Sequence, residues 1–87
     1  MNARYAIYPN PTSTGSFVLQ YNGKEMSDEE RGDEEIRELV MMDITGKVVF
    51  KTQVVLDGNA VEIEFGNLAS GVYVVMVGEE RMRLVVQ

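Results

Sequence analysis

Apolar residues occur along this chain in short runs of four to eight residues that are rich in Val, Ile, Phe and Tyr. The runs are bounded by Gly, Asn or Asp, which is typical of β-strands. The run 60–65 shows the strand period plainly, because Val61, Ile63 and Phe65 alternate with two glutamates. No stretch has helical periodicity, and the pattern predicts seven strands, at residues 4–8, 16–21, 36–43, 47–56, 60–65, 71–77 and 81–86.

Two runs near the end of the chain differ in how their apolar residues are placed. Residues 71–77 are apolar almost throughout, which is the pattern of a strand covered on both faces. Residues 81–86 alternate instead, with Met82, Leu84 and Val86 on one side and Arg81, Arg83 and Val85 on the other. The last strand is therefore predicted to have one apolar face and one face that carries both arginines.

The connections between the runs have the composition of turns. Residues 66–70 form the longest connection after the third predicted strand. We expect a short helical turn there that places Leu68 under a sheet edge. Three residue pairs predict hairpin turns: Thr45-Gly46, Asp57-Gly58 and Gly78-Glu79. Together these features predict an all-β fold, a seven-stranded antiparallel immunoglobulin-like β-sandwich made by one domain of residues 1–87.

One segment carries most of the negative charge. The chain has a net charge of -6, and residues 24–35 hold seven acids and two bases, a net of -5. Such a run buries too little apolar surface to offset its ordering entropy, so residues 22–35 are interpreted as a long acidic loop insertion. A solvated loop is favoured over a calcium site, although the sequence leaves calcium binding open. The tripeptide Arg31-Gly32-Asp33 is interpreted as coincidence, and the acidic balance argues against nucleic acid as a partner.

Side chains suited to catalysis are scarce in this sequence. The chain has no histidine and no cysteine, which removes the commonest general base and metal ligand and any thiolate chemistry. The serines therefore have no histidine to activate them, and no lysine spacing suggests a Ser–Lys pair. Glu62 and Glu64 alternate along a strand, as acids on a solvated sheet face do. We expect no enzymatic activity, no cofactor and, apart from calcium in the acidic loop, which stays open, no metal site.

The N-terminal residues do not have the pattern of a signal peptide. Arg4 and Tyr5 are soon followed by Pro9 and Pro11, with no apolar segment between them. No run approaches the roughly 20 apolar residues that span a bilayer. If the protein is exported, its targeting segment is missing from this sequence. We therefore expect a fragment of a longer protein, and the origin of Met1 is left open.

Three short motifs lie at the edges of the apolar runs, where the chain must reverse or begin a strand. Proline fixes φ and disfavours helix in the residue before it, so two prolines around Asn10 predict a stiff, extended lead-in. Gly46 and Gly71 predict positive φ or a close backbone approach. The motifs are Tyr8-Pro9-Asn10-Pro11-Thr12, Asp43-Ile44-Thr45-Gly46-Lys47 and Leu68-Ala69-Ser70-Gly71-Val72-Tyr73.

In this order, and followed by the basic-then-apolar residues 81–86, the motifs resemble the type A C-terminal sorting domain of the type IX secretion system. The resemblance runs from about Tyr8 to Gln87. It implies a non-catalytic label at the end of a secreted Bacteroidetes protein, attached to an N-terminal cargo. It also implies a secreted or cell-surface location, reached through the periplasm and the outer-membrane translocon, with cleavage of the label by a surface protease.

The resemblance and the motifs together indicate which residues a partner recognises. An exposed edge of the last strand would accept a partner strand, and it leaves open a homodimer through the same edge. The candidates are Pro9, Asn10, Pro11, Asp43, Gly46, Lys47, Gly71, Tyr73, Arg81, Arg83, Leu84 and Val85. The sequence departs from the family in its longer acidic connection after Tyr21 and in a C-terminus that holds fewer lysines.

The alternative interpretation is an immunoglobulin-like or fibronectin-like accessory binding module of a surface protein. An exposed cluster of aromatic residues on one face would favour it. The four tyrosines are instead scattered along the chain, and most are predicted to point into the core. The sorting domain is therefore the preferred interpretation.

Overall fold

Seven β-strands make up the fold. The computed structural model describes residues 5–21, 36–55 and 60–87, and these residues include no helix, hence none that could cross a membrane. The number and order of the strands agree with the prediction, and their bounds differ from it by a residue at several ends. The strands are β1 (Tyr5–Tyr8), β2 (Ser16–Tyr21), β3 (Ile36–Asp43), β4 (Val48–Val55), β5 (Ala60–Glu64), β6 (Gly71–Val77) and β7 (Glu80–Val86).

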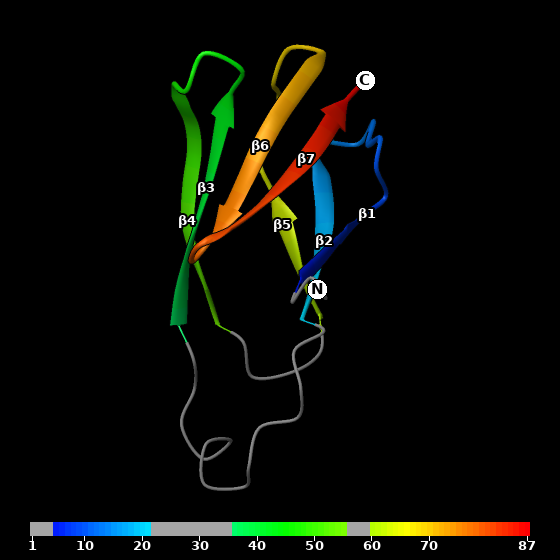
Figure 1. Cartoon of the computed structure of the whole chain (residues 1–87). Helices are drawn as coiled ribbons and strands as arrows, with labels where there is room; N and C mark the ends of the chain where they lie inside the picture. The colour runs from blue at the N-terminus through cyan, green and yellow to red at the C-terminus, as the bar shows by residue number, and fades with distance from the viewer. Residues whose placement is uncertain (1–4, 22–35, 56–59) are drawn as a thin grey trace, which may run out of the picture.

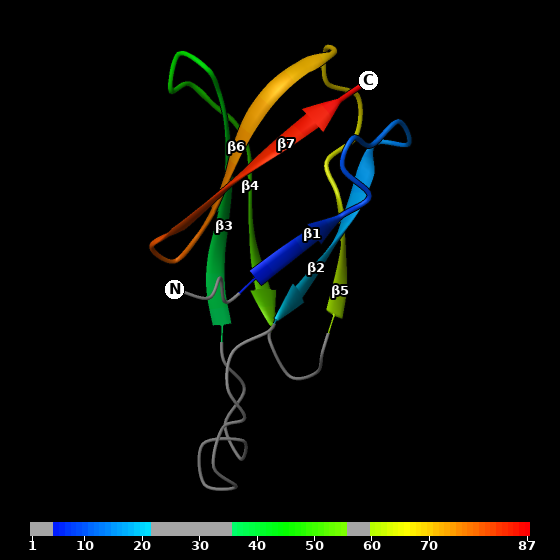
Figure 2. The same cartoon turned by 45° about the vertical axis from the view of Figure 1, so that its right-hand side comes forward.

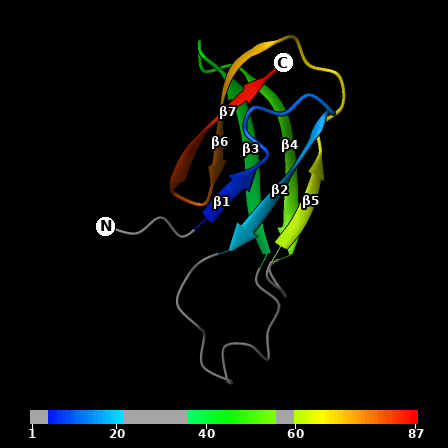
Figure 3. The ribbon, with the colours of Figure 1, turned by 90° about the vertical axis from the view of Figure 1, so that its right-hand side faces the viewer.

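The strands form two sheets that face each other (Figures 1 and 2). One sheet has three strands in the order β1-β2-β5, and the other has four in the order β4-β3-β6-β7. Every neighbouring pair is antiparallel. Figure 3 shows that β1 also runs close to β7, so the first and last strands lie beside each other. The predicted seven-stranded antiparallel sandwich is confirmed.

The core lies between the sheets and takes alternate residues from each strand. In the three-stranded sheet, Phe17 is paired with Ile63 across β2 and β5, and its ring lies 6.0 Å from that of Phe65. In the four-stranded sheet, Met41 is fully buried, while Met42 points to the other face, as a strand requires. Burial of each large aliphatic side chain contributes about 1.5–3 kcal/mol. The buried hydrophobic residues are Tyr5, Phe17, Leu19, Leu39, Met41, Val54, Ile63, Phe65, Tyr73, Val75, Val77, Leu84 and Val86.

The outer face of β6 corrects one prediction. The continuous apolar run 71–77 predicted a strand covered on both faces, but Val72 is 40% exposed. Val74 and Met76, on the same face, are half-buried. Strand β6 has neighbours on both edges but packs against the other sheet on one side only. The apolar run therefore reflects an apolar outer sheet face, not a strand enclosed between two layers.

The connection 66–70 corrects another prediction, because it contains no helical turn. Its backbone groups find partners elsewhere: Gly66 N donates to Gly15 O at 3.1 Å, and the Tyr73 hydroxyl donates to Ala69 O at 2.6 Å. Leu68 nevertheless packs against the core, as expected. The turns at Thr45-Gly46 and Gly78-Glu79 are confirmed. The turn at Asp57-Gly58 and the acidic loop 22–35 lie outside the described residues.

Gly15 occupies a position where a side chain should be costly. Its φ is +82°, and a Cβ atom there would lie 2.9 Å from Gly66 O, the backbone of the facing segment. Gly46 also has positive φ, at +92°, but a Cβ there would have no neighbour within 4 Å. We expect Gly15→Ala to lower the free energy of unfolding by roughly 1.5–2 kcal/mol and Gly46→Ala by about 1 kcal/mol. Urea unfolding measures both, and equal losses would contradict the close approach.

Candidate recognition site along the last strand

The first motif lies across the edge of the last strand. The side-chain amide of Asn10 makes two bonds with β7: its Nδ2 donates to Arg83 O at 2.6 Å, and Val85 N donates to its Oδ1 at 2.9 Å. Thr12 continues the contact, because its N–H donates to Val85 O and its C=O accepts from Gln87 N, both at 2.9 Å. Residues 9–12 are called the strap below, and they bond to β7 much as a neighbouring strand would.

The strap leaves only part of the β7 edge open. Alternate residues of an antiparallel strand direct their backbone groups to opposite sides, and those of Arg83, Val85 and Gln87 face the strap. By the same alternation the backbone groups of Arg81 face this edge, where no strand pairs with β7 in the described part of the chain. Within the described residues, this edge of β7 therefore has no strand partner at Arg81 and is covered by the strap at its end.

The strap itself differs from the stiff, extended lead-in that the prolines predicted. Residues 9–11 bend, and both the Tyr8–Pro9 and Asn10–Pro11 peptide bonds are cis. Hydrogen bonds to β7 hold the bend in place. Thr12, directly after it, is fully buried and donates its hydroxyl to Ser16 O at 2.6 Å, which ties the strap to β2 as well.

The second motif forms the turn between β3 and β4. One carboxylate oxygen of Asp43 accepts three hydrogen bonds, from Thr45 N at 2.9 Å, from Thr45 Oγ1 at 2.6 Å and from Lys47 N at 3.0 Å. Gly46 supplies the positive φ and donates its N–H to Asp43 O at 3.0 Å. The Thr45 hydroxyl bond, together with the Lys47 backbone bond, lowers the pKa of Asp43 below its ordinary value of 3.8.

This turn predicts a pH dependence of stability. Because the folded-state pKa of Asp43 is lowered, its contribution is present above the unfolded value of 3.8 and is lost as the pH falls through the folded value. Thr45→Val removes the main cause, so the pKa of Asp43 should rise toward 3.8 and this part of the acid sensitivity should shrink. NMR titration of the Asp43 carboxyl, with urea unfolding at about pH 7 and about pH 2.5, measures both effects. An unchanged titration would contradict the assigned hydrogen bond.

The third motif shapes the start of β6. The Tyr73 hydroxyl reaches back to Ala69 O, four residues earlier, while its ring is buried. Leu68 packs against the core. All three motifs therefore have a local structural role in building turns and connections, and any recognition role is additional to it.

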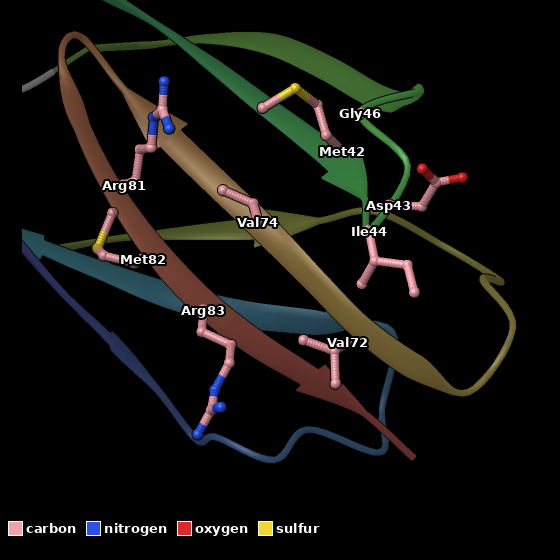
Figure 4. A pocket seen from close by; sticks show the side chains of 9 residues that line it. All are labelled: Met42, Asp43, Ile44, Gly46, Val72, Val74, Arg81, Met82 and Arg83. Carbon is pink, nitrogen blue, oxygen red and sulfur yellow. The ribbon is translucent and has the colours of Figure 1, made fainter.

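A depression of about 540 Å³, called the outer groove below, lies on the outer face of the four-stranded sheet (Figure 4). Its apolar lining comes from Met42, Ile44, Val72, Val74 and Met82, whose side chains Figure 4 shows on β3, the following turn, β6 and β7. The two arginines of β7 also line it, and Figure 4 shows their side chains extending in opposite directions. Four predicted site residues line it: Asp43, Gly46, Arg81 and Arg83.

The remaining predicted site residues fall into two groups. Tyr73 and Leu84 are 7% and 0% exposed, so they hold the fold and do not reach a partner while the domain is folded. The others lie in the strap, in the turns or on β7 with at least part of their surface exposed: Pro9, Asn10, Pro11, Lys47, Gly71 and Val85. Sequence reasoning did not single out Thr12 or the apolar groove residues. Apolar residues on both faces of β3 and β6 were the available signal for the groove.

The described residues define a class of protein: a small antiparallel sandwich, with no group of three or more acidic metal-ligand candidates, whose first motif is bonded to its last strand. The family model described as "Secretion system C-terminal sorting domain" matches residues 6–87. The chain therefore belongs to the family of type IX secretion C-terminal sorting domains, which are non-catalytic in general. Curated proteins and solved structures gave no match.

Family membership states the function at a coarse level. The domain is a sorting signal for type IX secretion, which interacts with that secretion machinery and is attached to an N-terminal cargo. The location is secreted or at the cell surface, reached by export across the outer membrane.

Proposed function

We propose that the domain is a removable label and that the export machinery recognises it in its folded form. One observation carries the proposal: the Asn10 side chain is bonded to Arg83 and Val85, which lie 73 and 75 residues later in the sequence. The strap and β7 are therefore a single recognition unit only when the sandwich is folded. A linear signal would not need this bond.

The predicted recognition residues divide into exposed and buried ones. Arg81, Arg83 and Lys47 reach solvent, whereas Leu84 and Tyr73 are buried. We infer that the exposed group contacts the translocon and that the buried group fixes its geometry. After export, a cell-surface protease separates the label from the N-terminal cargo.

A delivery experiment tests the proposal. Residues 1–87 are fused to a fluorescent protein that carries an ordinary export signal, and the fusion is expressed in a bacterium with this secretion system. We expect fluorescence at the cell surface and, by immunoblot, a reporter that has lost the mass of the domain. A known sorting domain serves as the parallel control. Periplasmic retention of this fusion, with surface delivery of the control, would contradict the proposal. Surface delivery of an uncleaved fusion would contradict only the cleavage step.

The accessory binding module has no supporting observation. Tyr5 and Tyr73 are buried and Tyr21 packs against the core, so Tyr8, at 44% exposed, is the only described tyrosine on the surface. A carbohydrate- or peptide-binding face would present several aromatic side chains together. The sorting label is the function that the described surface supports.

A further inference from the structure

The outer face of the four-stranded sheet is unusually apolar for a surface that no other described element covers. The large hydrophobic side chains that the described residues expose are Tyr8 and five others, and all five lie in this sheet or its β3–β4 turn: Ile36, Ile44, Val48, Val55 and Val72. Ile44, at the tip of the turn, is 78% exposed. Ile44, Val48 and Val72 lie toward the end of this sheet that holds the outer groove, whereas Ile36 and Val55 pair with each other at its other end. An exposed apolar patch marks an interaction site more often than singly scattered apolar residues do.

The opposite sheet has a different outer surface. There Glu62 and Glu64 of β5 are exposed, and they pair with Val18 and Ser16 of β2. This is the polar outer face expected of an antiparallel sandwich. Among the described residues, the four-stranded sheet therefore has the more apolar outer face.

Two arginines border the apolar surface. Arg83 is opposite Val74, and Arg81 is opposite Met76, in the β6–β7 register, so both side chains start on the outer face of the sheet, where both residues line the outer groove. Both arginines are exposed, and within the described residues no carboxylate lies within ion-pair distance of either. Asp43 also lines the groove, but its oxygen already accepts three hydrogen bonds from its own turn. Among the described residues, the groove is therefore lined by two arginines and one carboxylate, and neither arginine has an ion-pair partner there.

We propose that the outer groove binds a segment of the export machinery whose apolar side chains are flanked by carboxylates. This deepens the proposed function and rests on it. Apolar side chains of the segment cover Val72, Val74 and Ile44, and its carboxylates pair with the two arginines. An interface of this kind has a desolvated apolar centre with complementary charges at the rim, where they orient the partner.

A lipid surface fits the groove less well than a protein segment. Binding to anionic membranes typically uses clusters of about four to eight basic residues, whereas the groove has two, on a chain of net charge -6. Two arginines beside a bounded apolar depression can pair with only a few carboxylates. A protein segment presents such carboxylates at a fixed spacing, next to its own apolar side chains.

The delivery assay of the 1–87 fusion tests the groove with matched variants. Arg81→Glu with Arg83→Glu should lower surface delivery about tenfold, because like charges then meet across the interface. Lys51→Glu is the control on the same sheet face: Lys51 is exposed and pairs with Glu38 at 3.6 Å, outside the groove. It should deliver like the unmodified label. Ile44→Asp, at an exposed position, should lower delivery to a similar degree without touching the arginines.

The outcomes separate this proposal from the one that it rests on. If the unmodified label is not delivered, the sorting function fails. If it is delivered and the arginine pair and Ile44→Asp variants are delivered equally well, the groove proposal alone is overturned. The urea midpoint of each purified variant shows whether that variant folds. If the double arginine variant does not fold, the delivery of the Ile44→Asp variant tests the groove proposal.

Crosslinking identifies the occupant. A photo-crosslinking residue at Val72 should give an adduct during export with a peptide that contains Asp or Glu, and one at Glu62, on the other sheet, should not. Adducts from both positions or from neither would overturn the proposal. The purified domain should not sediment with vesicles containing a third anionic phospholipid. Sedimentation that the double arginine variant loses would identify a lipid surface instead and overturn the protein segment.

Discussion

Leu84→Ala is expected to lower the free energy of unfolding by about 3 kcal/mol, the largest loss for any single change considered. Leu84 is 0% exposed and lies on β7 opposite Tyr73, so truncation leaves a cavity between the sheets. A domain of this size has a total stability of about 5–15 kcal/mol, and it unfolds more readily after such a loss. Urea unfolding at neutral pH, followed by circular dichroism, measures the change.

Ile44→Ala is the matched control for that measurement. It also truncates a large aliphatic side chain, but one that is 78% exposed, so its effect should stay within about 0.5 kcal/mol. A loss below about 1 kcal/mol for Leu84→Ala would show that β7 does not close the core.

Asn10→Asp should produce the second largest effect, a loss of about 2.5 kcal/mol at neutral pH. The change is nearly isosteric, and one carboxylate oxygen still accepts from Val85 N. The other oxygen replaces the Nδ2 donor and lies against Arg83 O, at the position of the present 2.6 Å bond. Two acceptors at this distance repel each other, so the pKa of the new carboxyl should be raised in the folded state.

The pH dependence of the Asn10→Asp variant provides an internal check. A raised folded-state pKa means that stability is recovered below the unfolded value, about 3.9, and is lost as the pH rises through the folded value. Asn10→Ala, which removes both bonds without adding charge, should lose less, about 1–1.5 kcal/mol, at any pH. Hydrogen exchange of the Val85 amide should accelerate in both variants. An Asn10→Asp protein as stable as the parent would contradict the bidentate contact.

The architecture was predictable because local patterns agree with the global fold. Alternation in 60–65 and the hairpin at Gly78-Glu79 are short-range signals, and each appears where the sequence placed it. The error at 71–77 has a physical cause: periodicity counts apolar residues but does not show whether a second layer covers them. Val72 and Val74 therefore predicted an enclosed strand, although they form the outer surface of a sheet.

The candidate site was predictable as a set of residues but not as a geometry. The motif around Asn10 was identified from its prolines, and its contact with Arg83 and Val85 depends on tertiary pairing that no local rule contains. The burial of Thr12 arises in the same way, from its contacts with β2 and β7. Leu84 was a recognition candidate by its place in the last strand, and its alternation with two arginines already indicated an inward side chain.

Surface delivery of the Leu84→Ala fusion tests most directly whether the folded sandwich is what the translocon engages. No receptor can touch this side chain in the native domain, so only a loss of native structure links it to export. Delivery should fall with the fraction of native protein as the growth temperature rises, while the Lys51→Glu fusion, which is changed at an exposed residue outside the groove, should be delivered like the parent. Full delivery at a temperature where the purified Leu84→Ala domain is unfolded would show that the tail is read as a linear peptide.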